Sequence, residues 1–161
     1  RRILPYAAAV VVLIAAGAAL WLTGRQGPSP GELYDTYYKA PDAGTIAKPR
    51  GGTDLTDFSF LLEEIDRGMQ AATDTLKTPE EYFYFGVFCM NQERFSEAIY
   101  AFSQLAGSSD RQYHDDGQWY LGLCFLKLNR IDDAVRIFSE IALTRGHAYQ
   151  EQSRELLGKL K

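Results

Sequence analysis

The sequence predicts an all-α protein, in which one N-terminal transmembrane helix precedes a short array of about two α-α helical repeats with flanking helices. Three observations predict this class. Residues 3–22 contain no charged residue, two later stretches match each other at a constant register, and the second helix of each stretch has apolar residues at helical spacing. The 161 residues accordingly divide into an anchor at 1–24, a linker at 25–54 and a repeat domain at 55–161.

The uncharged run is long enough to cross a bilayer. At about 1.5 Å of rise per residue, a helix of this length spans roughly 30 Å, the thickness of the hydrocarbon core. Tyr6 and Trp21 lie near its two ends, where aromatic rings prefer the membrane interface. Arg1 and Arg2 favour an N-terminus on the cytoplasmic side, although Arg25 beyond the run weakens that asymmetry.

Two questions about this run stay open. A cleavable signal peptide would also be apolar, but its hydrophobic region usually has about 7–15 residues, which favours a retained anchor. Small residues on one side of a membrane helix allow close packing, so the run either contacts a second membrane helix or lies alone in lipid. The candidate packing residues are Ala8, Ala15 and Ala19.

Residues 25–54 carry prolines and glycines that interrupt any helical period, and this composition predicts a linker. Tyr34, Tyr37 and Tyr38 form an aromatic cluster within it. The cluster is interpreted either as a juxtamembrane segment that lies against the membrane or the domain, or as an element that docks a partner.

The repeat domain is expected to open with a helix over residues 55–76, because apolar side chains recur there every three and four residues. The apolar face of this helix consists of Phe58, Leu61, Leu62, Ile65, Met69 and Ala72. A second helix is predicted to start after Thr78. Pro79 suits the first helical position, and Glu81 lies where the acidic residue of a capping box belongs.

Residues 79–105 match residues 115–141 at a register of 36 residues. The matched pairs are Gly86 with Gly122, Ala98 with Ala134, and Phe102 with Phe138. We expect the glycines to let the two helices of each hairpin approach closely, with the alanines opposite them. The phenylalanines are then expected to fill the gap to the next unit, because one unit cannot bury its apolar face alone.

These matches resemble the tetratricopeptide repeat pattern W-x2-L-G-x2-Y followed by A-x3-F. The second unit carries Leu121-Gly122, Phe125, Ala134 and Phe138, and the first unit carries Phe85-Gly86, Ala98 and Phe102. The chain departs from the family in its period, which is longer than the usual value of about 34 residues. The resemblance implies stacked hairpins of antiparallel helices.

Nearly the whole chain is also similar to a group of single-span bacterial proteins of the Bacteroidetes type, which have a tyrosine-rich linker and a few such repeats. The matching motifs are "LYDTYY" at residues 33–38 and "GHAYQEQ" at residues 146–152. This resemblance implies a single-pass anchor in the inner (cytoplasmic) membrane and a repeat domain in the periplasm.

In tetratricopeptide arrays the first helices of successive units line a concave groove, so the resemblance implies where a partner would bind. The corresponding positions are Phe83, Val87, Met90 and Asn91 in the first unit and Trp119, Leu123, Leu126 and Lys127 in the second. This groove suits an extended or helical apolar peptide anchored on Phe83 and Trp119, since rigid aromatic rings bury much area at low entropic cost. The alternative occupant is the protein's own linker, through its three tyrosines.

The sequence contains no Gly-rich phosphate loop, GxSxG, HExxH or EF-hand motif. His114 and His147 are interpreted as exposed residues at helix starts, and Asp115-Asp116 as solvated charges at a helix start. Cys89 and Cys124 lie in apolar helical runs, which favours buried thiols over a disulfide. We therefore expect no enzymatic activity, no metal site and no cofactor.

These observations predict a membrane-anchored protein–protein interaction module, a scaffold or accessory subunit of a membrane protein complex. The net charge of −4 argues against nucleic acid, because phosphate binding relies on clustered Lys and Arg. The expected partners are proteins and, through the N-terminal helix, membrane lipid, with no small-molecule substrate. Two alternatives stay open: a transmembrane regulatory relay with a cytoplasmic segment before Arg1, and an assembly chaperone that binds transiently.

Overall fold

The computed structural model describes residues 27–39 and 76–160, and the regular structure in these two ranges is α-helical throughout. The helices are α2 (Pro30–Tyr37), α5 (Pro79–Asn91), α6 (Phe95–Ala106), α7 (Arg111–Lys127), α8 (Ile131–Leu143) and α9 (Gln150–Lys159). These two ranges contain no β-strand, so the prediction of an all-α class is confirmed for them.

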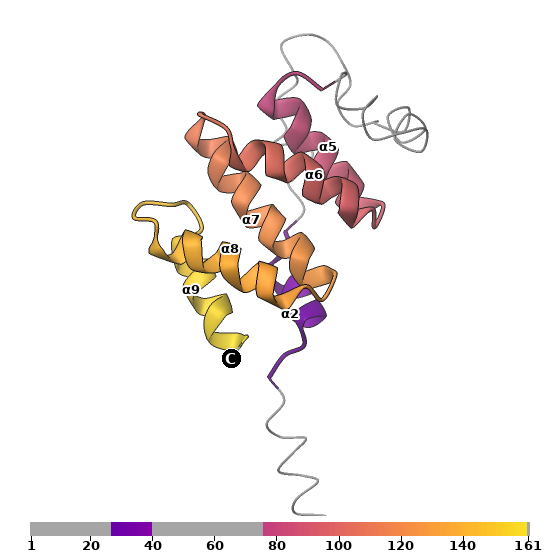
Figure 1. Ribbon diagram of the computed structural model, residues 1–161. Coiled ribbons are helices and arrows are strands. Elements are labelled where there is room, and N and C mark those ends of the chain that lie inside the picture. Colours follow the sequence, from indigo (N-terminus) through magenta and orange to yellow (C-terminus); the bar gives the residue numbers. More distant parts are fainter. Residues whose placement is uncertain (1–26, 40–75, 161) are drawn as a thin grey trace, which may run out of the picture.

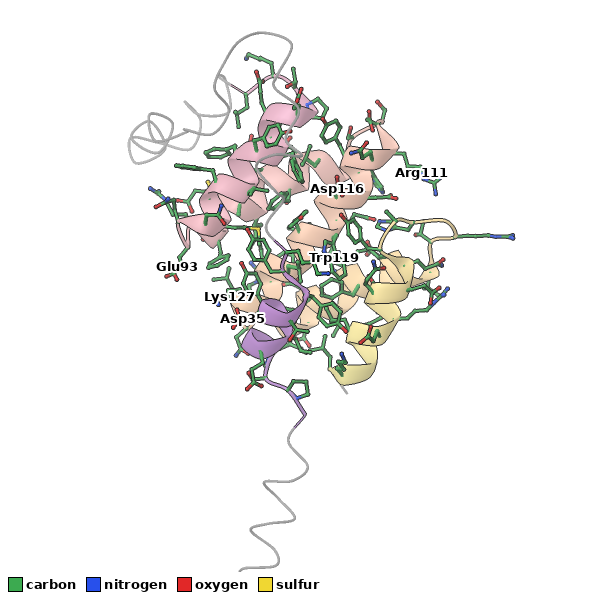
Figure 2. The ribbon with its side chains drawn as sticks, turned by 180° about the vertical axis from the view of Figure 1, so that it is seen from behind. Asp35, Glu93, Arg111, Asp116, Trp119 and Lys127 are labelled. Carbon is green, nitrogen blue, oxygen red and sulfur yellow. The ribbon has the colours of Figure 1, made fainter. Side chains whose placement is uncertain are left out.

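Helices α5 to α9 pack in chain order, each against the next, as Figure 1 shows. α5 and α6 form one hairpin, α7 and α8 form another, and α6 also packs along α7. Helix α2 departs from this order because it packs on α7, far along the chain. Seen from behind, in Figure 2, α2 crosses in front of α7 with α5 on one side and α9 on the other.

The predicted start of α5 is confirmed at the level of its cap. The Thr78 side chain accepts a hydrogen bond from the Glu81 amide, and the Glu81 carboxylate accepts one from the Thr78 amide at 2.9 Å. Pro79 occupies the first turn, where a backbone N–H would have no intrahelical acceptor, so nothing is lost because proline has none. The reciprocal bonds satisfy two backbone donors that a helix end otherwise leaves unpaired.

The glycines of the two units allow a close approach, but the group that approaches them differs from the prediction. A Cβ at Gly86 would lie 2.6 Å from Phe102 Cζ, and one at Gly122 would lie 2.7 Å from the Phe138 ring. Each phenylalanine therefore lies over the glycine of its own hairpin, where alanines had been expected. Phe102 also stacks on Tyr120 of the next unit at 5.3 Å, which is the role predicted for it.

The turns between the paired helices repeat the same backbone geometry. Glu93 between α5 and α6 has φ 58°, and Asn129 between α7 and α8 has φ 56°. The following arginines, Arg94 and Arg130, each pair with an acidic residue three positions later, Glu97 and Asp133. The 36-residue register thus extends from the side chains to the backbone.

Part of the predicted linker is helical. Helix α2 begins with a capping box, in which the Ser29 hydroxyl accepts from the Glu32 amide and the Glu32 carboxylate accepts from the Ser29 amide at 2.7 Å. Pro30 interrupted the helical period in the sequence, yet it lies in the first turn, where proline is tolerated. Leu33 and Tyr34 are buried at 1% and 5% exposure, so packing completes a helix that local pattern did not predict.

Several predictions concern residues outside the described ranges. These are the anchor at 1–24, with its candidate packing residues Ala8, Ala15 and Ala19, and the helix expected before Leu76. Among the residues that the structure describes, no helix is long and apolar enough to cross a membrane.

Candidate functional site

The face of the array where the sequence placed a binding groove is covered by α2. Leu33 and Tyr34 on this helix belong to the same apolar core as Val87, Met90 and Leu123. Of the two occupants that the sequence left open, the structure therefore has the protein's own segment in place.

The three tyrosines predicted as candidates for self-cover each meet an aromatic ring of the array edge-on. Tyr34 meets Phe95 at 5.9 Å, Tyr37 meets Trp119 at 6.2 Å, and Tyr38 meets Tyr120 at 6.3 Å between ring centroids. Edge-to-face pairs place the positive edge of one ring against the negative face of the other. The contacts therefore fix the rotation of α2 about its axis as well as its position.

Polar contacts surround this aromatic layer. The Tyr38 hydroxyl donates to Asn91 Oδ1 at 2.9 Å, and Lys127 Nζ lies 3.3 Å from Asp35 Oδ1. The same Lys127 ammonium lies 4.6 Å from the centroid of the Tyr34 ring, within the range of a cation–π contact. Figure 2 shows Asp35 and Lys127 side by side at one end of α2.

Burial raises the pKa of both Tyr34 and Tyr38, because a phenolate would lose its hydration at these positions. Both phenols are consequently neutral at physiological pH, and Tyr38 keeps the proton that it donates to Asn91. In the last turn of the helix, Lys159 on α9 donates to the Tyr37 hydroxyl at 3.0 Å. Helix α2 thus contacts α6, α7 and α9, and Tyr38, which caps it, contacts α5.

The eight predicted groove residues fall into two groups. Trp119 and Lys127 contact α2 directly, and Asn91 contacts Tyr38, which caps it. The others are mainly core: Val87, Met90, Leu123 and Leu126 are buried, and Phe83 is partly buried and packs against Phe102, Tyr113 and Tyr120.

The expectation that Phe83 and Trp119 stand free to anchor a peptide needs correction. Trp119 is 4% exposed, and its ring lies parallel to Tyr149 at 4.8 Å and edge-on to Phe138 at 5.4 Å. It is a core side chain that also contacts Tyr37 of α2. The repeat pattern predicts which helix face a residue occupies, but not how much of that face its neighbours cover.

A cavity of about 390 Å³ lies beside the C-terminal half of α2. Its lining combines aromatic rings with a few polar groups, from α2 and the segment after it, from α7, and from α9 and its N-cap residue. The lining residues are Thr36, Tyr37, Lys39, Trp119, Tyr120, Tyr149 and Gln152. The Tyr120 hydroxyl donates to the Lys39 carbonyl at 3.3 Å, so the backbone that leaves α2 is also tied to α7.

The acidic pair at Asp115 and Asp116 forms part of a buried polar cluster, which corrects its interpretation as solvated charge. Asp115 Oδ2 accepts from the Ala148 amide at 2.9 Å, and Asp116 Oδ1 accepts from the Tyr149 hydroxyl at 2.6 Å. Burial raises the pKa of the Asp116 carboxyl, while the Tyr149 hydrogen bond acts in the opposite direction. The pair holds the loop before α9 against α7.

His147 belongs to the same cluster and is buried at 4% exposure, not exposed as the sequence suggested. Its Nδ1 accepts from the Tyr149 amide at 3.1 Å, so the neutral ring carries its proton on Nε2. That proton is directed at Asp115 Oδ1 and Gln118 Oε1, at 3.3 and 3.2 Å. Burial lowers the pKa of His147, and Asp115 opposes this shift.

The other candidate groups in the described ranges are the two cysteines and any cluster of side chains that could bind a metal ion. Cys89 and Cys124 are free and fully buried, as predicted, and burial raises the pKa of the Cys89 thiol to about 12. A thiol of such high pKa is a poor nucleophile, because the thiolate is the reactive form. Residues 27–39 and 76–160 bring together no group of three His, Cys, Asp or Glu side chains able to hold a metal ion.

Sequence reasoning missed three residues of this site. Asp35 lay in the presumed linker, and Tyr120 and Tyr149 were not assigned to the groove. Tyr149 did carry a signal, because it lies 36 residues after Tyr113 and both tyrosines meet a first-helix aromatic residue. For Asp35 the signal was the capping box at Ser29, which marks the start of a helix that includes this residue.

Comparison of the chain with protein-family models, with curated proteins and with solved structures finds no match.

Proposed function

We propose that this protein is a membrane-anchored protein–protein interaction module, a scaffold or accessory subunit of a membrane complex. In this proposal, helical repeats of the tetratricopeptide type present their groove to a protein partner. The N-terminal run at residues 3–22 holds the protein in the inner membrane, with the repeats in the periplasm. The proposal assigns the protein no catalytic role, no nucleic-acid partner and no cofactor.

The observation that carries the proposal is the manner in which α2 lies on α7. Rigid rings on the array, Phe95, Trp119 and Tyr120, receive the side chains of a short helix, and polar groups bound the contact. Aromatic centres with polar rims are typical of surfaces that bind proteins. A surface that receives one helix in this way has the chemistry needed to receive another.

Site-specific photocrosslinking in membranes tests the proposal. A photoreactive amino acid replaces Lys127 at the groove, or Arg136 on α8, whose ion-pair partners Asp133 and Glu140 lie on its own helix. We expect a crosslinked partner protein from position 127 and none from the matched position 136. A protein recovered only as a free monomer from both positions would contradict the proposal.

A further inference from the structure

We propose that α2 is a replaceable occupant of the groove, and that the partner presents a helix with the same chemistry as α2, which binds only after α2 has left. This inference rests on the proposed function and specifies the partner: a short helix with an apolar residue followed by an aromatic one, a further aromatic residue one turn later, and a carboxylate beside the buried pair. In α2 these positions are Leu33, Tyr34, Tyr37 and Asp35.

The chemistry of the ligand follows from the contacts that the array makes with α2. The apolar core accepts a leucine at 1% exposure, and ring edges or faces meet each aromatic residue. The ammonium of Lys127 meets both a carboxylate, at 3.3 Å, and an aromatic face, at 4.6 Å. Asn91 offers a carbonyl oxygen to a hydroxyl donor. A basic or strongly polar helix would leave these groups unmatched.

The helix is held by few buried groups, which makes its departure feasible. Of its eight residues, only Leu33 and Tyr34 are buried. The contact of Asp35 with Lys127 joins side chains that are 66% and 33% exposed, a situation in which ion pairs contribute little stability. Isolated helices of fewer than about 12 residues are marginal in water, so α2 is expected to unfold when it leaves.

Residues outside α2 hold the aromatic residues of the groove, so we expect the groove to keep its shape when α2 leaves. Trp119 is fixed by Tyr149 and Phe138, and Tyr120 is fixed by Phe102 and Phe83. None of these four supporting residues belongs to α2. A binding surface that is ordered before its ligand arrives loses little entropy on binding.

A peptide with the sequence of residues 27–39 serves as the probe, and the full chain serves as the receptor. In one receptor, the double substitution Leu33→Ala and Tyr34→Ala weakens the resident α2 and leaves the groove residues unchanged. We expect the peptide to bind this receptor at least about tenfold more tightly than it binds the wild type, because it no longer competes with α2. Equal binding to both receptors, or binding to neither, would overturn the inference.

A second arm keeps the buried residues Leu33 and Tyr34 in one of its receptors and so remains informative if the double variant unfolds. The substitution Lys127→Glu is placed in the wild-type receptor and in the double variant, and the peptide is compared with one carrying Asp35→Lys. We expect the charge-reversed peptide to prefer receptors with Lys127→Glu and the native peptide to prefer receptors that keep Lys127, each by about a few-fold. No change of preference would place the peptide elsewhere and overturn the inference.

Two further results are distinguishable. Dimers of the wild-type chain that disappear on addition of peptide would make a second copy the occupant and would overturn the assignment to a partner. In the other result, the peptide binds neither receptor, but position 127 still crosslinks to a partner protein. The proposed function would then stand, and only the chemistry assigned to its ligand would be wrong.

Discussion

At the scale of single residues, the two equivalent turns differ in how well their residues suit the backbone. Glu93 and Asn129 both adopt positive φ, where asparagine is tolerated and glutamate is disfavoured. We predict that Glu93→Asn raises the free energy of unfolding by about 0.5–1 kcal/mol, because it relieves left-handed strain. Urea denaturation followed by circular dichroism measures this change.

The second repeat supplies the matched control for this prediction. Asn129→Glu introduces the strain that Glu93 carries, so it should lower the free energy of unfolding by a similar amount. Shifts of the same sign for both substitutions would show that the turns are not equivalent.

Gly117 is a second residue whose identity is set by packing. A Cβ there would lie 2.6 Å from Leu105 Cβ and 2.7 Å from the Ala106 amide nitrogen, and this backbone cannot move aside easily. We predict that Gly117→Ala lowers the free energy of unfolding by about 1–3 kcal/mol through overpacking. Gly158→Ala is the control, because nothing lies within 4 Å of that site, and the gain in helix propensity should stabilise by up to about 1 kcal/mol.

The sequence was informative at single residues only where the chemistry was local. It predicted the cap at Thr78 because the residues of a capping box lie three positions apart. It missed the contact of Phe102 with Gly86 and the burial of His147, because these surroundings come from other helices. A glycine at a repeat position indicates close approach, but not the group that fills the space.

At the scale of elements, the two capping boxes allow a comparison of α2 with α5. Ser29 and Thr78 make equivalent bonds, and each substitution to alanine removes a contribution of about 1 kcal/mol to its helix. We predict different consequences. Ser29→Ala should increase amide hydrogen exchange in α2 and trypsin cleavage at Lys39, with little change in the melting temperature, because α2 opens locally.

Thr78→Ala should instead lower the melting temperature of the whole domain, because α5 packs on both α6 and α7 and cannot open alone. If Ser29→Ala lowered the melting temperature as much as Thr78→Ala, α2 would be an inseparable part of the domain. That result would also weigh against its exchange for a partner helix.

Helix α2 also shows the limit of sequence patterns for short elements. Eight residues hold too few apolar positions for a period to be recognised, and Pro30 and Gly31 both suggested a linker. The longer helices α6 and α8 could be predicted from their period, because each carries five apolar residues along one face.

At the scale of the whole molecule, the loop before α9 links stability to pH through His147. Burial lowers the pKa of His147 from 6.5 in the folded protein, so protonation favours the unfolded chain. The contribution of neutral His147 to the free energy of unfolding is complete above pH 6.5, and it is lost as the pH falls from 6.5 toward the lowered pKa. Asp115 faces the ring and opposes the shift, whereas His114 and Arg111 strengthen it.

We therefore predict that the wild type loses more stability than His147→Gln between about pH 8 and about pH 5, by at most about 1.4 kcal/mol per pH unit. Urea denaturation at several pH values measures the difference. Parallel pH profiles for wild type and His147→Gln would contradict the role given to His147.

Asp116 acts in the opposite sense. Because its pKa is raised in the folded protein, the folded state gains stability as the pH falls toward 3.8, and Asp116→Asn removes this effect.

The sequence by itself determined the helical class, the cap of α5, the 36-residue register and the burial of both cysteines, because each depends on spacing along one helix or on a repeat within the chain. Only the tertiary structure decided which side chains cover the predicted groove and which polar groups are buried. Tyr37 reaches Trp119, and Asp115 reaches His147, across long stretches of sequence. No local period encodes such contacts, because they arise from the packing of separate helices in three dimensions.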